Sequence, residues 1–175
     1  MLVGTDVTIR PATAADEAAV TEIHARGIAD VFAGRYFPPA AERAERQRSW
    51  AGPLGAPSPR HAWLVAEQAG RVVGFAAMGP ARDADVDAAT TGELRVVLVE
   101  ARARGLGVGS ALIAAAERAL RDSGFLAAML WVLPDNAQAV CCYERCGWRA
   151  GGNERTTEFG GREIRSVRYE RRLTA

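Results

Sequence analysis

VEARARGLGVGSAL, residues 99–112, joins an apolar run to a helix-like run through a loop in which glycine alternates with other residues. Beyond the loop, apolar side chains recur at every fourth position from Val108 to Leu120, which predicts a helix over 107–122 with one buried face. The glycines let the backbone turn sharply and approach a ligand, and the start of the helix directs unpaired N–H groups at that ligand. This order of strand, glycine loop and helix predicts a phosphate-binding site.

The same stretch discriminates among three kinds of phosphate loop. A Walker A loop needs a lysine at the terminal phosphates, and the sequence contains no lysine. A dinucleotide loop needs a different glycine spacing and an acidic residue at the end of the next strand, whereas the predicted strand 126–133 carries no acid. Coenzyme A remains, because its pyrophosphate fits a short loop while its pantetheine arm lies along the preceding strand. Arg102 and Arg104 add two positive charges beside this loop.

Three further motifs flank the loop. They are ELRVVLV at 93–99, PDN at 134–136 and CYERCGW at 142–148. Together with RGLGVG at 104–109, they resemble the GNAT superfamily of acetyl-CoA-dependent N-acetyltransferases, and the resemblance covers residues 7–173. The chain departs from the family pattern at Ala101, where relatives usually have proline, and at Cys142, where they usually have phenylalanine. Neither departure removes a group that must donate or accept a proton.

The resemblance implies a mixed α/β fold in a single domain over residues 1–175, with its core at 7–173. A mostly antiparallel central sheet of about seven strands with about four helices is expected, with two strands splayed apart at the acyl-CoA cleft. The sequence pattern places helices at 13–28, 39–50, 107–122 and 136–146, and strands at 7–10, 61–67, 71–78, 93–99 and 126–133, before a closing hairpin through 159–161.

The resemblance also implies which residues contact acetyl-CoA as the co-substrate. Backbone groups of Val97, Leu98 and Val99 are expected to pair with the pantetheine arm, as an added strand would. Backbone amides of the loop are expected to hold the pyrophosphate; the residues concerned are Arg104, Gly105, Leu106, Gly107, Val108, Gly109 and Ser110. Arg102 and Arg145 either reach the 3′-phosphate or are solvated surface charges.

Two residues around the 136–146 helix have a structural alternative beside the functional one. Asn136 either hydrogen-bonds the coenzyme or caps the helix; Asp135 is an equal candidate for the cap, with Gln138 completing its capping box. Tyr143 is expected to be the general acid for the departing thiolate, and its alternative is a half-buried aromatic on an amphipathic helix. Moving a proton from a phenol of pKa ~10 to a thiolate of pKa ~8.5 is uphill by roughly 2 kcal/mol, so hydrogen bonding matters more than early transfer.

Glu93 is expected to be the general base, acting directly or through a water, because an amine attacks a thioester only when it is neutral. Its alternative is a solvated carboxylate that caps an exposed strand end. Asp85, Asp87 and Glu100 are weaker candidates for the base. A backbone amide near Val99, where the family's central strand bulges, is expected to meet the oxyanion.

The acceptor side is the least determined part of the sequence. Phe32 and Tyr36, with Phe37 and Trp50, fit a lid over a small amine, a homodimer contact or a satellite core, and the sequence does not select among the three. The favoured acceptor is a primary amine of a small molecule or amino acid. The alternatives are a protein N-terminus or side chain, a longer acyl group, and a non-catalytic module that senses acyl-CoA.

The amino-acid composition limits which partners, cellular location and metal sites are expected for this protein. The 175 residues are 49% apolar and 25% charged with a net charge of +1, which is typical of a soluble enzyme and argues against nucleic acid or an anionic membrane as the main partner. No stretch resembles a signal peptide or a membrane span, so a cytoplasmic location is expected. Two separate histidines, and three cysteines without ligand spacing, predict no metal site.

Overall fold

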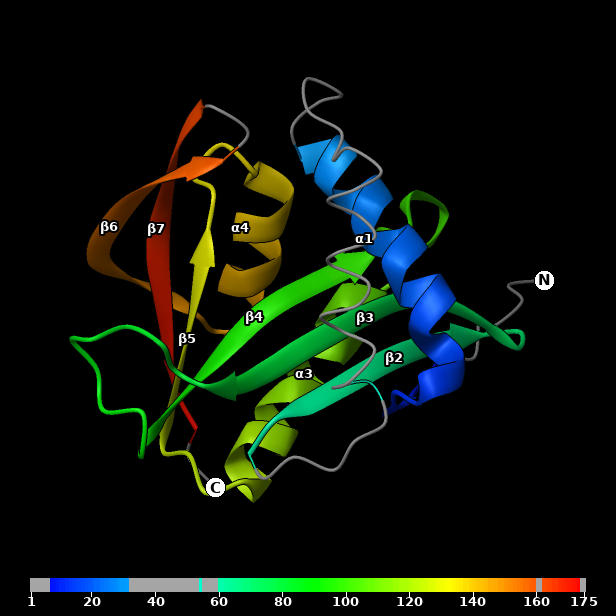
Figure 1. The fold of residues 1–175 in the computed structure, drawn as a ribbon, viewed down its shortest axis with the longest axis horizontal. Coiled ribbons are helices and arrows are strands. Elements are labelled where there is room, and N and C mark those ends of the chain that lie inside the picture. Colours follow the sequence, from blue (N-terminus) through cyan, green and yellow to red (C-terminus); the bar gives the residue numbers. More distant parts are fainter. Residues whose placement is uncertain (1–6, 32–53, 55–59, 160–161, 174–175) are drawn as a thin grey trace.

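The computed structural model of the chain describes residues 7–31, 54, 60–159 and 162–173. Its centre is a seven-stranded sheet in the order β1-β2-β3-β4-β5-β7-β6 (Figure 1). The strands are β1 Val7–Pro11, β2 Ala62–Gln68, β3 Arg71–Pro80, β4 Thr91–Val99, β5 Ala127–Val132, β6 Arg149–Phe159 and β7 Arg162–Arg172. The helices are α1 Glu17–Val31, α3 Val108–Asp122 and α4 Ala137–Arg145, with the short 3₁₀ turns η1 Ala14–Asp16 and η2 Ala101–Ala103.

Neighbouring strands are antiparallel with one exception, the pair β4 and β5. These two strands run parallel and pair only over residues 91–93 and 127–129, after which they separate. The predicted mixed, mostly antiparallel sheet with splayed strands is therefore confirmed. The predicted helix over 39–50 lies outside the described residues, so the described part of the chain holds one α-helix fewer than the four expected.

Helices cover both faces of the sheet, with α1 in front and α3 behind in the view of Figure 1. Behind the sheet, the spaced apolar residues of α3, among them Leu112 and Leu120, are buried in the larger core. In front, α1 packs Val20 and Ile23 into a smaller core around Phe75. The fourfold spacing along α3 is thus a packing pattern, as predicted. In the described ranges, no helix is both long enough and apolar enough to cross a membrane.

One irregularity in β4 changes which side chains face which helix. The register of β3 and β4 shifts between Ala77 and Met78, which leaves Arg95 without a partner on β3. Side chains alternate between the two faces of a regular strand. Here Leu94 belongs to the core under α3, whereas Val96, two residues later, belongs to the core under α1. The extra residue therefore turns the second half of β4 over.

The family resemblance predicts a bulge near Val99, and the bulge of this structure lies elsewhere in β4. The pairing of β3 with β4 is regular from Val96 to Val99, so a bulge near Val99 is wrong for this pair of strands. The bulge occurs at Arg95, whose Nη2 donates to the Pro80 carbonyl at 3.0 Å while its Nε lies 3.7 Å from Glu93. An extra residue lets a strand re-aim a side chain, and these contacts are what Arg95 gains from it.

A single buried carboxylate, Asp16, ties together the first elements of the chain. The Thr13 N–H donates to Asp16 Oδ2 at 2.8 Å, as in a capping box at the start of a helix. Arg10 of β1 donates two hydrogen bonds to the same carboxylate, at 2.8 and 2.9 Å, and a third to Glu67 of β2. Because Arg10 hydrogen-bonds the ionised form, the pKa of Asp16 falls from 3.8 to about 2.

Because the pKa of Asp16 is lower in the folded than in the unfolded protein, the ionised carboxylate stabilises the fold. This stabilisation is complete at pH values above the unfolded pKa and is lost as the pH falls toward 2. Asp16→Asn is therefore expected to lower the free energy of unfolding by about 2 kcal/mol at pH 7 and by about half as much at pH 3. Urea unfolding at both pH values measures this difference. Glu22→Gln is the control, because the Glu22–Arg26 pair on α1 is exposed and should matter little. An equal loss at both pH values would contradict the assignment.

Candidate active site

A cavity of about 710 Å³ opens where β4 and β5 separate, and we call it the cleft. Its walls come from α1, the second half of β4, the glycine loop, α3 and α4 (Figure 1). Ten of the predicted coenzyme contacts line it: Val97, Leu98, Val99, Arg104, Gly105, Gly107, Gly109, Ser110, Asn136 and Tyr143. The fold thus brings residues of the glycine loop and of all three flanking motifs to one site.

The glycine loop and the start of α3 form one wall of the cleft. Gly107 precedes α3 with φ of 83°, a left-handed conformation that only glycine adopts freely. No side chain of the described residues caps α3, and a Cβ built on Gly105 or Gly107 would have no atom within 4 Å. The first N–H groups of the helix thus have no side-chain cap, and Gly109 and Ser110 of its first turn line the cleft, an arrangement that suits an anion such as a pyrophosphate.

Asn136 starts the opposite wall, at α4. Its Oδ1 accepts the Ala139 N–H at 3.2 Å, so Asn136 is the helix cap, and the alternative of a cap by Asp135 is wrong. Capping occupies only the side-chain oxygen. The side-chain NH₂ of Asn136 makes no hydrogen bond within the described residues, and it remains available to a ligand in the cleft. The two interpretations of Asn136 are therefore compatible.

Tyr143 lies two turns further along α4 and is half-buried in the cleft wall. Its ring packs 6.2 Å from the ring of Trp148, centroid to centroid. Burial raises the pKa of the Tyr143 phenol above its ordinary value of 10, and the thiols of Cys142 and Cys146 add to the shift. The hydroxyl therefore stays protonated at neutral pH. It has no hydrogen-bond partner in the part of the chain that the structure describes, so it is a free donor at the cleft.

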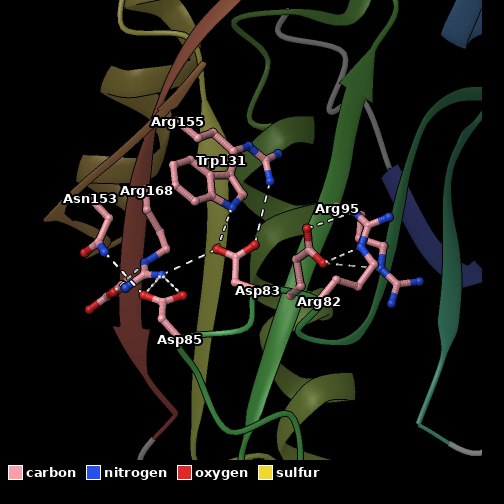
Figure 2. Close-up of polar contacts among 10 residues, drawn as sticks. Arg82, Asp83, Asp85, Arg95, Trp131, Asn153, Arg155 and Arg168 are labelled. Atoms are coloured by element: carbon pink, nitrogen blue, oxygen red, sulfur yellow. Dashed lines mark hydrogen bonds and ion pairs between the residues drawn. The ribbon is translucent and has the colours of Figure 1, made fainter. Parts of the chain in front are cut away.

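Glu93 has surroundings that the sequence does not predict (Figure 2). Its side chain is buried, and both oxygens accept hydrogen bonds from Arg82, at 2.8 and 2.9 Å. Arg95 lies 3.7 Å from the same carboxylate. The alternative of a solvated cap on an exposed strand end is therefore wrong. Glu93 forms the last pair between β4 and β5, at the point where the strands separate, but it does not line the cleft itself.

Comparison with known proteins agrees with this arrangement. The sequence model of the acetyltransferase (GNAT) family matches residues 26–148. The chain belongs to the GNAT acetyltransferase family. It is 33% identical over 156 residues to the phosphinothricin N-acetyltransferase of Streptomyces viridochromogenes. The aligned region covers 87% of this GNAT chain and 80% of that protein.

Other relatives of this GNAT chain are longer. It is 32% identical over 161 residues to a mycothiol acetyltransferase of Parafrankia sp., covering 85% of this chain and 48% of that protein. The chain spans about half the length of the mycothiol acetyltransferases that it matches. The structure of yncA from Salmonella typhimurium, solved with its cofactor acetyl-CoA, superposes with a TM-score of 0.75 at 24% identity, covering 96% of this chain and 94% of that one. This similarity shows a shared fold.

Arg104 of the GNAT glycine loop braces the cleft. Its Nε donates to the Val99 carbonyl at 2.9 Å, and its Nη2 donates to Asp30 of α1 at 2.6 Å. The side chain thereby ties the end of β4 to α1. The guanidinium of Arg104, predicted to lie beside the coenzyme phosphates, is thus already paired with a carboxylate, and the phosphate contact of the loop amides stays a prediction.

Three predicted coenzyme contacts lie outside the cleft lining. Leu106 is 53% exposed, and Val108 is buried in the core, so only the backbone of these two residues can serve the predicted contact. Arg102 lines a second cavity, of about 510 Å³, and its Nε donates to Glu100 at 2.6 Å. Arg145, the other candidate for the 3′-phosphate, lines the cleft. Contact with the 3′-phosphate stays a prediction for both arginines.

The loop between β3 and β4 is held by a network that the sequence analysis misses (Figure 2). Asp83 accepts a hydrogen bond from Trp131 of β5 at 3.0 Å, and Asp85 accepts one from Arg168 of β7 at 2.7 Å. Arg168 is buried, and its Nη1 also lies 3.4 Å from Asp83. Strand alternation places Trp131 and Arg168 on one face, but it cannot identify the loop carboxylates that pair with them. Asp85, a weaker candidate for the base, is part of this network.

The aromatic residues predicted for the acceptor side, Phe32, Tyr36, Phe37 and Trp50, lie outside the described residues. The lid, the dimer contact and the satellite core therefore all stay predictions. Asp87, the remaining weaker candidate for the base, accepts the Ala89 N–H at 2.8 Å within a turn. That contact gives Asp87 a structural role in the loop.

Gly107→Val is expected to weaken acetyl-CoA binding by about tenfold or more, because the new side chain enters the open space of the loop. Gly124→Val is the matched control: its φ is 85°, it follows the other end of α3, and it does not line the cleft. Both variants should lose about 1–2 kcal/mol of stability from the left-handed backbone. Calorimetric titration and thermal unfolding separate the two effects. Equal losses of affinity in the two variants would contradict the phosphate site.

Proposed function

We propose that this chain is an N-acetyltransferase domain, with its core at 7–173, that moves the acetyl group of acetyl-CoA to a primary amine of a small molecule or amino acid by direct attack. The observation that carries the proposal is the cleft, in which an uncapped helix start and a free tyrosine hydroxyl line one cavity. The phosphinothricin N-acetyltransferase and mycothiol acetyltransferase names of relatives support small acceptors. Three free cysteines are consistent with the reducing cytoplasm.

Binding of acetyl-CoA would use backbone groups at two places. The N–H groups at the start of α3 would hold the pyrophosphate, for the electrostatic reasons that apply to any helix N-terminus. Within the described residues, β4 beyond Glu93 has no strand partner on its β5 side, so the backbone groups of Val97 and the Val99 N–H are available to the amides of the pantetheine arm. The Leu98 backbone faces β3 instead. The Val99 carbonyl is not available, because Arg104 already donates to it.

The reaction forms a C–N bond between the amine and the acetyl carbon and breaks the C–S bond of the thioester. The thiolate leaves with the electron pair, and the amine must lose a proton. Tyr143 would stabilise the leaving thiolate by donating a hydrogen bond. Because the pKa of its phenol is raised, full proton transfer would cost more than the roughly 2 kcal/mol expected for an ordinary tyrosine. Electrostatic stabilisation is therefore its main contribution.

Glu93 would act on the acceptor side, through a water. Each carboxylate oxygen already accepts a hydrogen bond from Arg82, so direct proton transfer from the amine would disturb these contacts. A water held by the carboxylate can pass the proton without moving either side chain. The position of Glu93 at the divergence of β4 and β5 supports this role, because the thioester would lie in the gap between these strands.

Tyr143→Phe is expected to keep the affinity for acetyl-CoA within about twofold and to lower the turnover number by about 10-fold to 100-fold, since only the hydroxyl is lost. Calorimetry measures the affinity, and steady-state thiol release measures the turnover. Because the phenol pKa is raised, the parent enzyme should not lose activity through ionisation of Tyr143 as the pH rises to 9. Unchanged turnover in the variant would remove the proposed role.

Glu93→Gln is expected to lower turnover by about tenfold at pH 7 and to recover partly at higher pH, where more of the amine is already neutral. The pH profile of kcat measures this recovery. Glu117→Gln is the control, because Glu117 is also buried and ion-paired, with Arg171, but lies away from the cleft lining. A Glu93→Gln profile parallel to that of the parent would leave Glu93 with a purely structural role.

The function itself is tested by titrating the protein with acetyl-CoA and then following thiol release over a panel of small amines, amino acids and peptides. Binding with release for small amines or amino acids supports the proposal. Release with peptides alone would favour a protein acceptor, and binding without release from any acceptor would favour an acyl-CoA sensor. Absence of binding would overturn the assignment of the cleft.

A further inference from the structure

One helix of the cleft carries three thiols that the proposed reaction does not use. Cys141, Cys142 and Cys146 are all free and lie on α4 or at its end. Cys142 is half-buried and lines the cleft, and its Sγ lies 3.8 Å from Ser110 Oγ. The same sulfur would lie 3.6 Å from a Cβ built on Gly109. A nucleophilic side chain thus contacts the first turn of α3, where the pyrophosphate is expected.

The three thiols differ in their surroundings. Cys141 also lines the cleft but is exposed, so a group attached to it can extend into solvent. Cys146 does not line the cleft, and burial raises the pKa of its thiol, which lowers the fraction of reactive thiolate. Cys142 Sγ lies against Ser110 on its α3 side, and the side chain lines the cleft. A group attached to Cys142 must therefore occupy the cleft.

We propose that Cys142 is a modification site at which a mixed disulfide with a low-molecular-weight thiol reversibly closes the cleft to acetyl-CoA. The proposal rests on the proposed function, because it takes the cleft as the coenzyme site. Cys142 loses its proton to solvent, and the thiolate attacks a small disulfide, R–S–S–R. A new S–S bond joins Cys142 to one R–S group, and the other leaves as R–S⁻ with the electron pair. Cys142 is oxidised, the departing half is reduced, and a free thiol reverses the exchange.

Competition follows from the geometry. Acetyl-CoA on the α3 amides and an adduct on Cys142 would fill the same volume, so each excludes the other. Bound acetyl-CoA should therefore protect Cys142 from disulfides, and the adduct should abolish binding without unfolding the protein.

The experiment uses three full-length variants that each keep one thiol. C141S/C146S keeps Cys142, C142S/C146S keeps Cys141, and C141S/C142S keeps Cys146. Each variant is first titrated with acetyl-CoA, which has no free thiol, to set its own baseline. Each is then treated with the aromatic disulfide 5,5′-dithiobis(2-nitrobenzoate), labelling is followed by thiolate release, and the titration is repeated before and after reduction.

Support consists of three results. Labelling of Cys142 weakens acetyl-CoA binding by about tenfold or more, reduction restores it, and saturating acetyl-CoA slows the labelling by a similar factor. Labelling of Cys141 should change the affinity by less than about twofold, because its adduct can reach solvent. These results would assign the effect to one sulfur and not to thiol modification in general.

Three outcomes would overturn the proposal. Labelled Cys142 protein that binds acetyl-CoA as before, or a Cys142 thiol that does not react, overturns it while leaving the proposed function intact. A larger loss of acetyl-CoA affinity from labelling Cys141 than from labelling Cys142 would place the sensitive thiol at Cys141 and would also overturn the proposal. Absence of acetyl-CoA binding to the unmodified parent protein instead overturns the proposed function, and this proposal with it.

Discussion

Pairing between β4 and β5 stops after three residue pairs, and the rest of the structure is arranged around that interruption. The last pair joins Glu93 to Met129, and two residues later the bulge at Arg95 turns β4 over. A bulge increases the local twist of a strand, so β4 leaves the plane of β5 and, beyond Glu93, keeps strand pairing only with β3. Backbone N–H and C=O groups of β4 that would otherwise pair with β5 are left at the edge of a cavity. The cleft is thus a consequence of incomplete strand pairing.

The short helix α4 completes the cleft and packs against the larger core through partly buried side chains. None of its residues is fully buried, yet most of its length lines the cavity. Asn136 fixes its start through a cap, and Trp148, buried just beyond its end, donates to Glu117 of α3 at 2.8 Å. The helix is therefore anchored at both ends while its middle faces the cleft. Such a wall presents Tyr143 and Cys142 to the cleft while their side chains also pack against the larger core.

Arginine side chains act mainly as internal braces in this protein. Arg10, Arg82, Arg104 and Arg168 each pair with a carboxylate of another element or of a loop. Arg104 and its partner Asp30 are 74 positions apart in the chain, and Arg168 and its partner Asp85 are 83 positions apart. A guanidinium offers several donors in a rigid plane, so one side chain can fix two partners at once. The positive charge of these four arginines is thus used in ion pairs that join separate parts of the fold, and of the four only Arg104 lines the cleft.

Local patterns were sufficient to predict the parts of the fold that depend on neighbouring residues. The glycine loop, the helix α3, a cap at the start of α4 and the strands β2 and β3 all follow from periodicity, backbone freedom and capping, which act over a few residues. The choice of Asn136 over Asp135 as the cap came from the structure. The family motifs correctly placed Val97–Val99, Asn136 and Tyr143 around one cleft. Only the tertiary structure decided the burial of Glu93, the bulge at Arg95 and the partners of Arg104, because these depend on which distant strands and loops meet. An ion pair is set by positions in space, and a sequence pattern carries only positions along the chain.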